Sequence, residues 1–153
     1  MTEVRVMFGT ESGNAEMVAD EIVDAFAERG IDAASVDLTD VDVATLAPAH
    51  VLIVSSTYNE GDLPASAEPF VEALTSEGPD LTGLRFAAFG LGDSTYEHYN
   101  NGIEQLRQLL LGLGAEQVGE TGKHDASSGT SPIDVAVAWA TSTTEHFALT
   151  PTA

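Results

Sequence analysis

Cysteine is absent from the 153-residue chain, which excludes disulfide bonds and thiolate metal ligands. Long apolar runs are absent too, since no stretch approaches the ~20 residues that span a bilayer. The amino terminus lacks the basic segment and apolar block of a signal peptide. We therefore expect a cytoplasmic protein that does not bind membranes. A hydrophobic content of 43% allows one substantial core at this length, so residues 1–153 are expected to form a single domain.

Basic residues are nearly as scarce. Five Lys and Arg residues face 25 Asp and Glu residues, Lys123 is the only lysine, and the net charge is −20. Such a surface repels nucleic acid and anionic membranes. The composition is typical of proteins from salt-loving microbes, in which ~1 M salt shortens the Debye length to ~3 Å. An acidic docking face for a basic partner is the alternative explanation, and the two are compatible.

The predicted fold is organised around the segment VRVMFGTESGNAE. Alternating apolar residues from Val4 to Phe8 predict a strand that stops at Gly9, and a helical pattern begins at Asn14 or Ala15. Residues 10–13 carry two hydroxyls and a glycine but no basic side chain. A turn into a helix N-terminus directs backbone N–H groups at one point, which suits a phosphate.

The same loop excludes two common phosphate-binding motifs. It lacks the Gly-Lys-Ser/Thr ending of a Walker loop and the three glycines of a dinucleotide fingerprint. It therefore favours a terminal monophosphate bound by neutral donors, with an ordinary strand-to-helix turn as the alternative.

Strand and helix patterns alternate five times along the chain. Further strands are predicted near residues 31–38, 50–56, 83–90 and 115–118. Helices are predicted from the first loop to Gly30, after a Ser66 cap, from Asn101, and from the Ser131-Pro132 start. This alternation predicts a parallel sheet with helices on both faces. Ligands of such sheets bind beyond the carboxyl ends of the strands, where the loops after the first, third and fourth strands emerge.

All three tyrosines lie in two of these loops. Tyr58 follows the third strand, and Tyr96 and Tyr99 follow the fourth. Aromatic residues at a ligand-binding edge favour a flat ligand held by stacking, with loop anchoring as the alternative. Together with the first loop they predict a ligand that has a phosphate at one end and a planar ring at the other. Trp139, in the final helix, is predicted to be a packing residue.

Three motifs, FGTESGNAE, SSTYNEGDLPASAEPF and FGLGDSTYEHYNNG, resemble the flavodoxin family. The second and third are most similar to the FMN-binding domains of diflavin reductases, and the resemblance spans nearly the whole chain. It implies an α/β fold, a flavodoxin-like three-layer sandwich whose five-stranded parallel sheet has the order 2-1-3-4-5. It also implies one non-covalent FMN between the first and third strands.

The resemblance further implies which residues bind FMN. Residues 10–15 would wrap the phosphate, Tyr58 and Tyr96 would cover the two faces of the isoalloxazine ring, and Asp93 would lie near its pyrimidine edge. Asp125 corresponds to a further contact in the reductase-like members. The full predicted set is Thr10, Glu11, Ser12, Gly13, Asn14, Ala15, Ser56, Thr57, Tyr58, Asn59, Gly61, Leu91, Gly92, Asp93, Tyr96, His98, Tyr99, Asn100 and Asp125.

Two residues depart from the family pattern. Glu11 adds a carboxylate beside the phosphate, which is expected to weaken binding unless the side chain points to solvent. Asn59 stands where many members have glycine, and asparagine adopts positive φ only at a modest cost. We therefore expect Asn59 to affect the redox potential.

Three other site types are disfavoured. GLGDST after the fourth strand resembles a truncated dinucleotide fingerprint, but it lacks the third glycine and an immediately following helix. A response-regulator receiver needs an Asp at the end of the third strand, where this chain has Ser55 and Ser56. No metal site is predicted, because the four histidines lack metal-ligand spacing.

The resemblance implies an electron carrier and not an enzyme. Such a protein would shuttle single electrons between an NAD(P)H-dependent flavodoxin reductase, or a similar donor, and a redox acceptor enzyme. We expect it to be a monomer. The alternative is a flavodoxin-fold interaction or accessory subunit that serves one specific redox enzyme.

Overall fold

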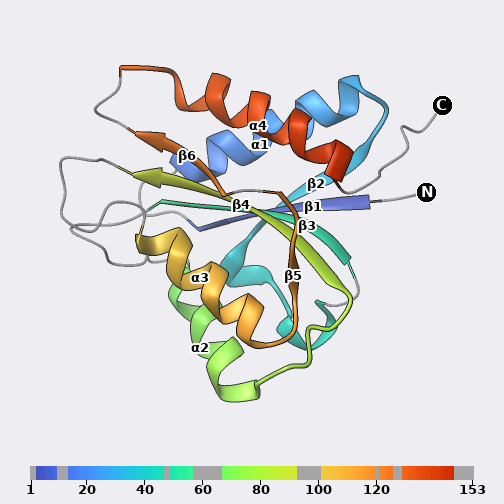
Figure 1. Cartoon of the computed structure of the whole chain (residues 1–153), viewed down its shortest axis with the longest axis vertical. Helices are drawn as coiled ribbons and strands as arrows, with labels where there is room; N and C mark the ends of the chain where they lie inside the picture. The colour runs from blue at the N-terminus through green and yellow to red at the C-terminus, as the bar shows by residue number, and fades with distance from the viewer. Residues whose placement is uncertain are drawn as a thin grey trace.

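A parallel β-sheet forms the centre of the protein (Figure 1). The computed structural model describes residues 3–9, 14–46, 49–56, 67–92, 101–119, 121–125 and 129–146. The sheet has the order β2-β1-β3-β4-β5, with β6 also paired to β4. Its strands are β1 (Glu3–Gly9), β2 (Asp32–Asp37), β3 (Ala49–Ser56), β4 (Leu84–Gly92), β5 (Glu116–Gln117) and β6 (Gly122–Asp125). This arrangement confirms the predicted parallel α/β sheet and its strand order.

Helices cover both faces of the sheet, as predicted (Figure 1). One face packs against α1 (Asn14–Glu28) and α4 (Pro132–His146). The other packs against α2 (Glu68–Glu77), α3 (Asn101–Gly112) and the short helices η1 (Leu38–Asp40) and η2 (Val43–Thr45). Successive residues of β3 alternate between the two cores, with Leu52 and Val54 on the α1 side and Val51 and Ile53 on the α3 side. Burial on both faces explains why this strand is almost entirely apolar.

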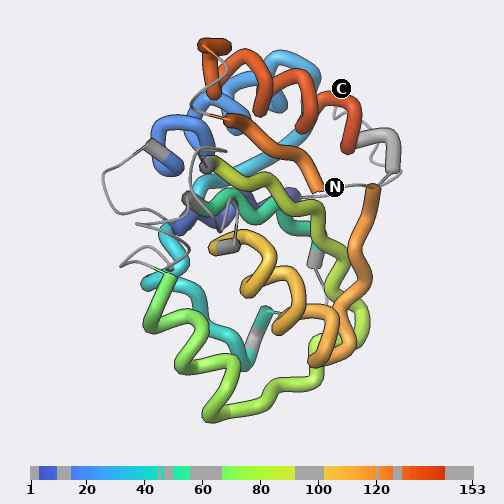
Figure 2. The backbone as a smooth tube through the Cα atoms, turned by 60° about the vertical axis from the view of Figure 1, so that its left-hand side comes forward, coloured from blue at the N-terminus to red at the C-terminus, as the bar shows by residue number. Residues whose placement is uncertain are grey.

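The fifth position of the sheet differs from the single strand predicted near residues 115–118. Two short strands share it: β5 pairs with Arg85 and Phe86 at the start of β4, and β6 pairs with the residues from Phe89 to Gly92 at its end. Between them the chain passes through Gly119, which has φ of 72°. Figure 2 shows β6 alongside β4 and beneath α4. The GKHD segment of β6 was not predicted because it is short and polar, and its place in the sheet depends on tertiary packing.

Trp139 is a packing residue, as predicted. Its ring centroid lies 5.1 Å from that of Phe89, with the ring planes tilted by 49°. This aromatic pair lies over Gly122 of β6, because a Cβ at that position would come within 2.6 Å of both rings. The glycine therefore lets β6 approach the α4 layer closely enough to pair with β4.

The helix ends follow local sequence signals in two of three tested cases. Gly30 ends α1 with φ of 73°, and the backbone N–H of Ile31 bonds to the carbonyl of Phe26 at 2.9 Å. The Ser131 hydroxyl accepts a 3.3 Å hydrogen bond from the N–H of Asp134 at the start of α4. For α2 the prediction of Ser66 as the cap is wrong: the N-cap residue is Ala67, which makes no side-chain cap. None of the helices in the described ranges is long and apolar enough to cross a membrane.

His50, at the amino-terminal end of the sheet, has an environment that can be tested by titration. His50, near the start of β3, is paired across the strands with Arg85 of β4. Partial burial, and secondarily the positive charge of Arg85, hold the pKa of His50 below its usual value of 6.5. As the pH falls below about 6.5, the unfolded chain takes up a proton that the folded protein resists. The free energy of unfolding should therefore decrease as the pH falls from about 6.5 to the pKa of His50 in the folded protein.

We expect an NMR titration to place the pKa of His50 below 6.5 and the Arg85→Met variant to raise it part of the way back. Burial remains in that variant, so full recovery is not expected. Arg29→Met removes an exposed charge that does not contribute to the shift, so this matched control should leave the titration unchanged. A pKa of His50 at or above 6.5 would contradict the described environment.

Candidate FMN site at the carboxyl ends of the strands

Three strands end side by side at one edge of the sheet. In the strand register, Gly9 of β1 is opposite Ser55 of β3, and Ser56 of β3 is opposite Leu91 of β4. Because all these strands are parallel, the chain leaves each of them on the same side of the molecule. The three segments with the least ordinary composition therefore begin at one place, as the alternation of strands and helices predicted.

The end of β1 is packed tightly against its neighbours. A Cβ at Gly9 would lie 3.0 Å from Leu38 Cδ1, 3.1 Å from Ala67 Cβ and 3.2 Å from Ser55 Oγ. A larger residue would have to displace one of these buried side chains. The glycine thus allows the chain to leave β1 directly between the end of β3 and the beginning of α2.

The first turn of α1 is anchored in the core beside this exit. Ala15 is fully buried and belongs to the same core cluster as Val6 and Phe8 of β1. The helix that starts here has 15 residues, so the positive end of its dipole lies at the sheet edge. No Lys or Arg lies in residues 6–28, so this segment itself offers an anion only neutral donors. The donor set therefore fits a terminal phosphate such as that of FMN.

A second contribution to the edge comes from β6, which the sequence did not reveal. Its register places Asp125 opposite Gly92, the last residue of β4. Asp125 was predicted as an FMN contact only from the family resemblance, and the structure shows which strand brings it to the edge. Six residues along from His124, the carbonyl of Thr130 lies 2.8 Å from Nε2 of that buried histidine. This contact ties β6 to the segment that leads into α4.

The predicted site residues divide into two groups. Ala15, Leu91 and Asp125 lie at the sheet edge, as do the backbones of Asn14, Ser56 and Gly92. The others are outside the described residues, so their placement stays a prediction. They are Thr10, Glu11, Ser12, Gly13, Thr57, Tyr58, Asn59, Gly61, Asp93, Tyr96, His98, Tyr99 and Asn100.

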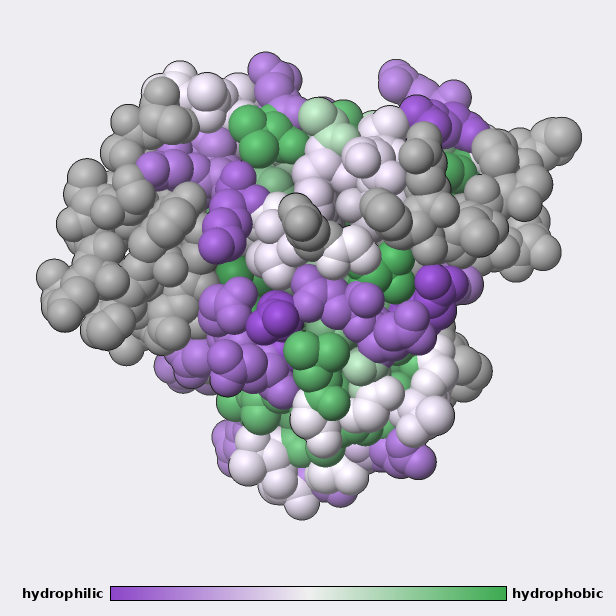
Figure 3. Space-filling view, in the orientation of Figure 1, coloured by the Kyte–Doolittle hydropathy of each residue, from purple (hydrophilic) through white to green (hydrophobic). Residues whose placement is uncertain are grey.

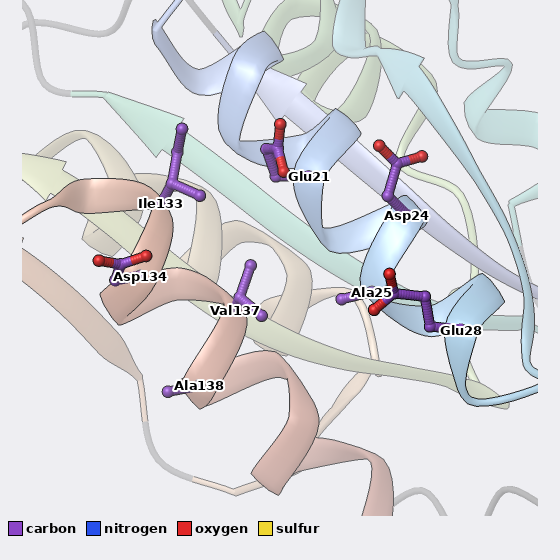
Figure 4. A pocket seen from close by; sticks show the side chains of 8 residues that line it. All are labelled: Glu21, Asp24, Ala25, Glu28, Ile133, Asp134, Val137 and Ala138. Carbon is purple, nitrogen blue, oxygen red and sulfur yellow. The ribbon is translucent and has the colours of Figure 1, made fainter.

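Two other kinds of site were considered within the described residues, a metal site and a second pocket, and neither suits a phosphate ligand. No group of three or more His, Asp or Glu side chains within the described ranges could hold a metal ion. A groove of about 400 Å³ lies between α1 and α4, with Ile133 and Val137 directed toward α1 and the carboxylates of Glu21 and Asp24 on the opposite side (Figure 4). It lies between two helices and not at the strand ends, and an acidic border does not suit a phosphate.

Comparison with known proteins gives the same fold and family. A family model described as flavodoxin matches residues 6–139. Protein MioC of Escherichia coli K12 is 32% identical over 142 residues, covering 91% of this chain and 94% of its own length. NADPH–cytochrome P450 reductase of Rattus norvegicus is 35% identical over 126 residues, covering 78% of this chain but only 19% of the reductase. A solved variant of flavodoxin from Pseudomonas aeruginosa has 31% identity and a TM-score of 0.82, covering 92% of this chain and 95% of that one.

Proposed function

Because this chain belongs to the flavodoxin family, we propose that it carries single electrons from a flavodoxin reductase, or a similar NAD(P)H-dependent donor, to a redox acceptor enzyme. It is a flavodoxin-like FMN electron carrier and not an enzyme. The finding that carries the proposal is the convergence of β1, β3 and β4 at one edge, beside the anchored N-terminus of α1. FMN supplies the one-electron chemistry when it is bound.

The chain's own residues would bind and shield the cofactor. We propose that the loop of residues 10–15 binds the phosphate through backbone N–H groups and the side chains of Thr10, Ser12 and Asn14. Tyr58 and Tyr96 would cover the two faces of the ring and exclude water from it. The net charge of −20 disfavours additional negative charge at the site, so the protein should make full reduction of the flavin less favourable.

We propose a cytoplasmic, monomeric protein in which residues 1–153 form one domain. The composition, with 25 acidic and five basic residues, supports adaptation to high salt. Figure 3 shows hydrophilic residues at several places on one face, interleaved with hydrophobic ones.

The direct test of the cofactor is the visible spectrum of the protein purified in high salt. We expect a yellow protein that quenches the fluorescence of added FMN and does not bind FAD in its place. A colourless protein that fails to quench FMN would overturn the cofactor. Electron exchange with a reductase then separates a carrier from an accessory subunit that only binds the flavin.

The Tyr96→Ala variant tests the proposed ring contact. Stacking contributes ~0.5–1.5 kcal/mol beyond burial of area, so the dissociation constant for FMN should rise by roughly 2- to 12-fold. Tyr96→Phe keeps the ring and is the matched control. The measurement is a fluorescence titration of each apoprotein with FMN. Equal affinity of the alanine and phenylalanine variants would place Tyr96 away from the flavin.

A further inference from the structure

Two of the five basic residues of this acidic chain meet in one pocket. The pocket has a volume of about 450 Å³ and lies where α3 faces β5 and β6. Its lining contains Arg107 and Lys123, and Lys123 is the only lysine of the chain. The remaining lining residues are Glu104, Gln117, Gly119 and Thr121. The pocket is thus polar, and it opens where the chain leaves the sheet between β5 and β6.

Hydrogen bonds hold the Arg107 guanidinium in a defined orientation. Its Nε donates to Oε1 of Gln117 at 2.6 Å, and Nη1 donates to Oε2 of Glu104 at 3.2 Å. These two bonds use two of the five N–H donors that a guanidinium carries. An arginine fixed on one side in this way presents its remaining donors without the entropy cost of ordering a free side chain.

The rest of the network also leaves donors in excess. Nε2 of Gln117 donates to the Thr121 hydroxyl oxygen at 2.9 Å, so the Thr121 O–H is left to donate onward. Lys123 is exposed, and its ammonium group has no partner within the described ranges. Three acceptor oxygens, those of Gln117 Oε1, Glu104 Oε2 and Thr121 Oγ1, are used within the network, while N–H and O–H groups remain for a ligand.

The charge of the described lining is opposite in sign to that of the chain. Among these residues Arg107 and Lys123 are cationic and Glu104 is anionic, which gives +1 in a protein whose net charge is −20. A ligand that accepts hydrogen bonds and carries one negative charge would match both the donors and the local charge. A phosphate dianion fits less well, because Glu104 would repel its second charge.

We propose that this pocket binds a carboxylate group. The planar guanidinium pairs with two carboxylate oxygens at once, whereas Lys123 supplies a second, adjustable charge. The carboxylate could belong to a small organic acid or to an acidic side chain of another protein, and both sources present the same two oxygens. None of the lining residues belongs to the predicted FMN-binding set.

The test is an NMR titration of the FMN-loaded protein with acetate and with a glutamate-containing peptide, at constant ionic strength. We expect saturable shifts of the backbone amides of Gly119, Thr121 and Lys123. Arg107→Gln and Lys123→Gln should each weaken binding about tenfold or more, since each removes a charged hydrogen-bond donor. Arg107→Lys keeps the charge but loses the planar fork, so it should bind less well than the natural protein.

Arg29→Gln is the matched control, because it removes one positive charge from the end of α1 and should leave binding unchanged. Saturation by acetate alone would identify a free acid, and tighter binding of the peptide would identify a protein side chain; either supports the proposal. Equal losses in Arg29→Gln and Arg107→Gln, or tighter binding of inorganic phosphate than of acetate, would overturn it. Lys123→Gln changes an exposed residue, so it keeps the test decisive if Arg107→Gln does not fold.

Discussion

Replacing Gly122 by alanine is expected to lower the free energy of unfolding by about 1–3 kcal/mol, the usual cost of overpacking a core. The new Cβ would lie 2.6 Å from Phe89 Cδ2 and 2.6 Å from Trp139 Cδ1. Neither ring can move away easily, because Phe89 is fully buried and the two rings pack on each other. For a chain of this size, each kcal/mol corresponds to a fall of roughly 2–4 °C in melting temperature.

The matched control is Gly112→Ala. Gly112 is the last residue of α3, and a Cβ there meets nothing within 4 Å. Alanine should therefore be neutral or stabilising by up to about 1 kcal/mol. A double variant that also changes Trp139 to leucine should lose less stability than the sum of the two single variants, since the smaller side chain makes room. Unchanged stability of Gly122→Ala would show that β6 does not lie against this aromatic pair.

Lowering the salt concentration is expected to destabilise the whole protein, and α1 gives a specific reason. Glu16, Asp20, Asp24 and Glu28 form a row of exposed acids four residues apart, with no basic residue in the helix. Such neighbours lie about 5–6 Å apart. The Debye length is ~3 Å at 1 M salt but ~30 Å at 0.01 M, so only concentrated salt screens this row effectively. The melting temperature should therefore fall steadily as salt is removed, and FMN should be released.

The Asp24→Lys variant should reduce this salt dependence. Asp24 has one acid four residues before it and another four residues after it, so the change turns two repulsive pairs into attractive ones. At 0.2–0.5 kcal/mol for each interaction, we expect a gain of about 1 kcal/mol at low salt and little change at 1 M. The measurement is thermal unfolding by circular dichroism across the salt series.

Two control variants distinguish the effect of repulsion within the acidic row of α1 from the effect of the net charge of the protein. Asp24→Asn removes the repulsion without adding attraction and should give about half the gain. Glu72→Lys changes the net charge by the same amount as Asp24→Lys, but only one acid, Glu68, lies four residues away on α2. Equal gains from the two lysine variants would mean that net charge, and not the row on α1, controls stability. A melting temperature independent of salt would favour the acidic docking face over salt adaptation.

The redox effect of Asn59 and the weakening effect of Glu11 remain predictions, because both residues lie outside the described ranges. Their sequence signal came from comparison with the family pattern and not from local chemistry. The same holds for most of the ring-binding residues, including Tyr58 and Tyr96. What the structure adds is that β1, β3 and β4, the strands that precede these residues, end together at one edge.

The sequence by itself determined the class of fold and the edge of the sheet at which the loops proposed to bind FMN begin. Apolar runs such as residues 50–56 indicate strands buried on both faces, and the helices between them require parallel strands. Once strands are parallel, their carboxyl ends must meet at one edge, so the loops of interest converge whatever their detailed conformation. The end of α1 at Gly30 and the cap at Ser131 could also be predicted from the sequence, because each depends on residues within a few positions.

Only the tertiary structure decided the features that depend on residues far apart in the chain. The polar segment from Gly122 to Asp125 is a strand because β4 offers an open edge and because a glycine fits beneath Phe89 and Trp139. The meeting of Arg107 with Gln117 and of Lys123 with the same pocket likewise depends on how α3 packs against β5 and β6. Periodicity reports which face of an element is buried, but it carries no information about which distant partner buries it.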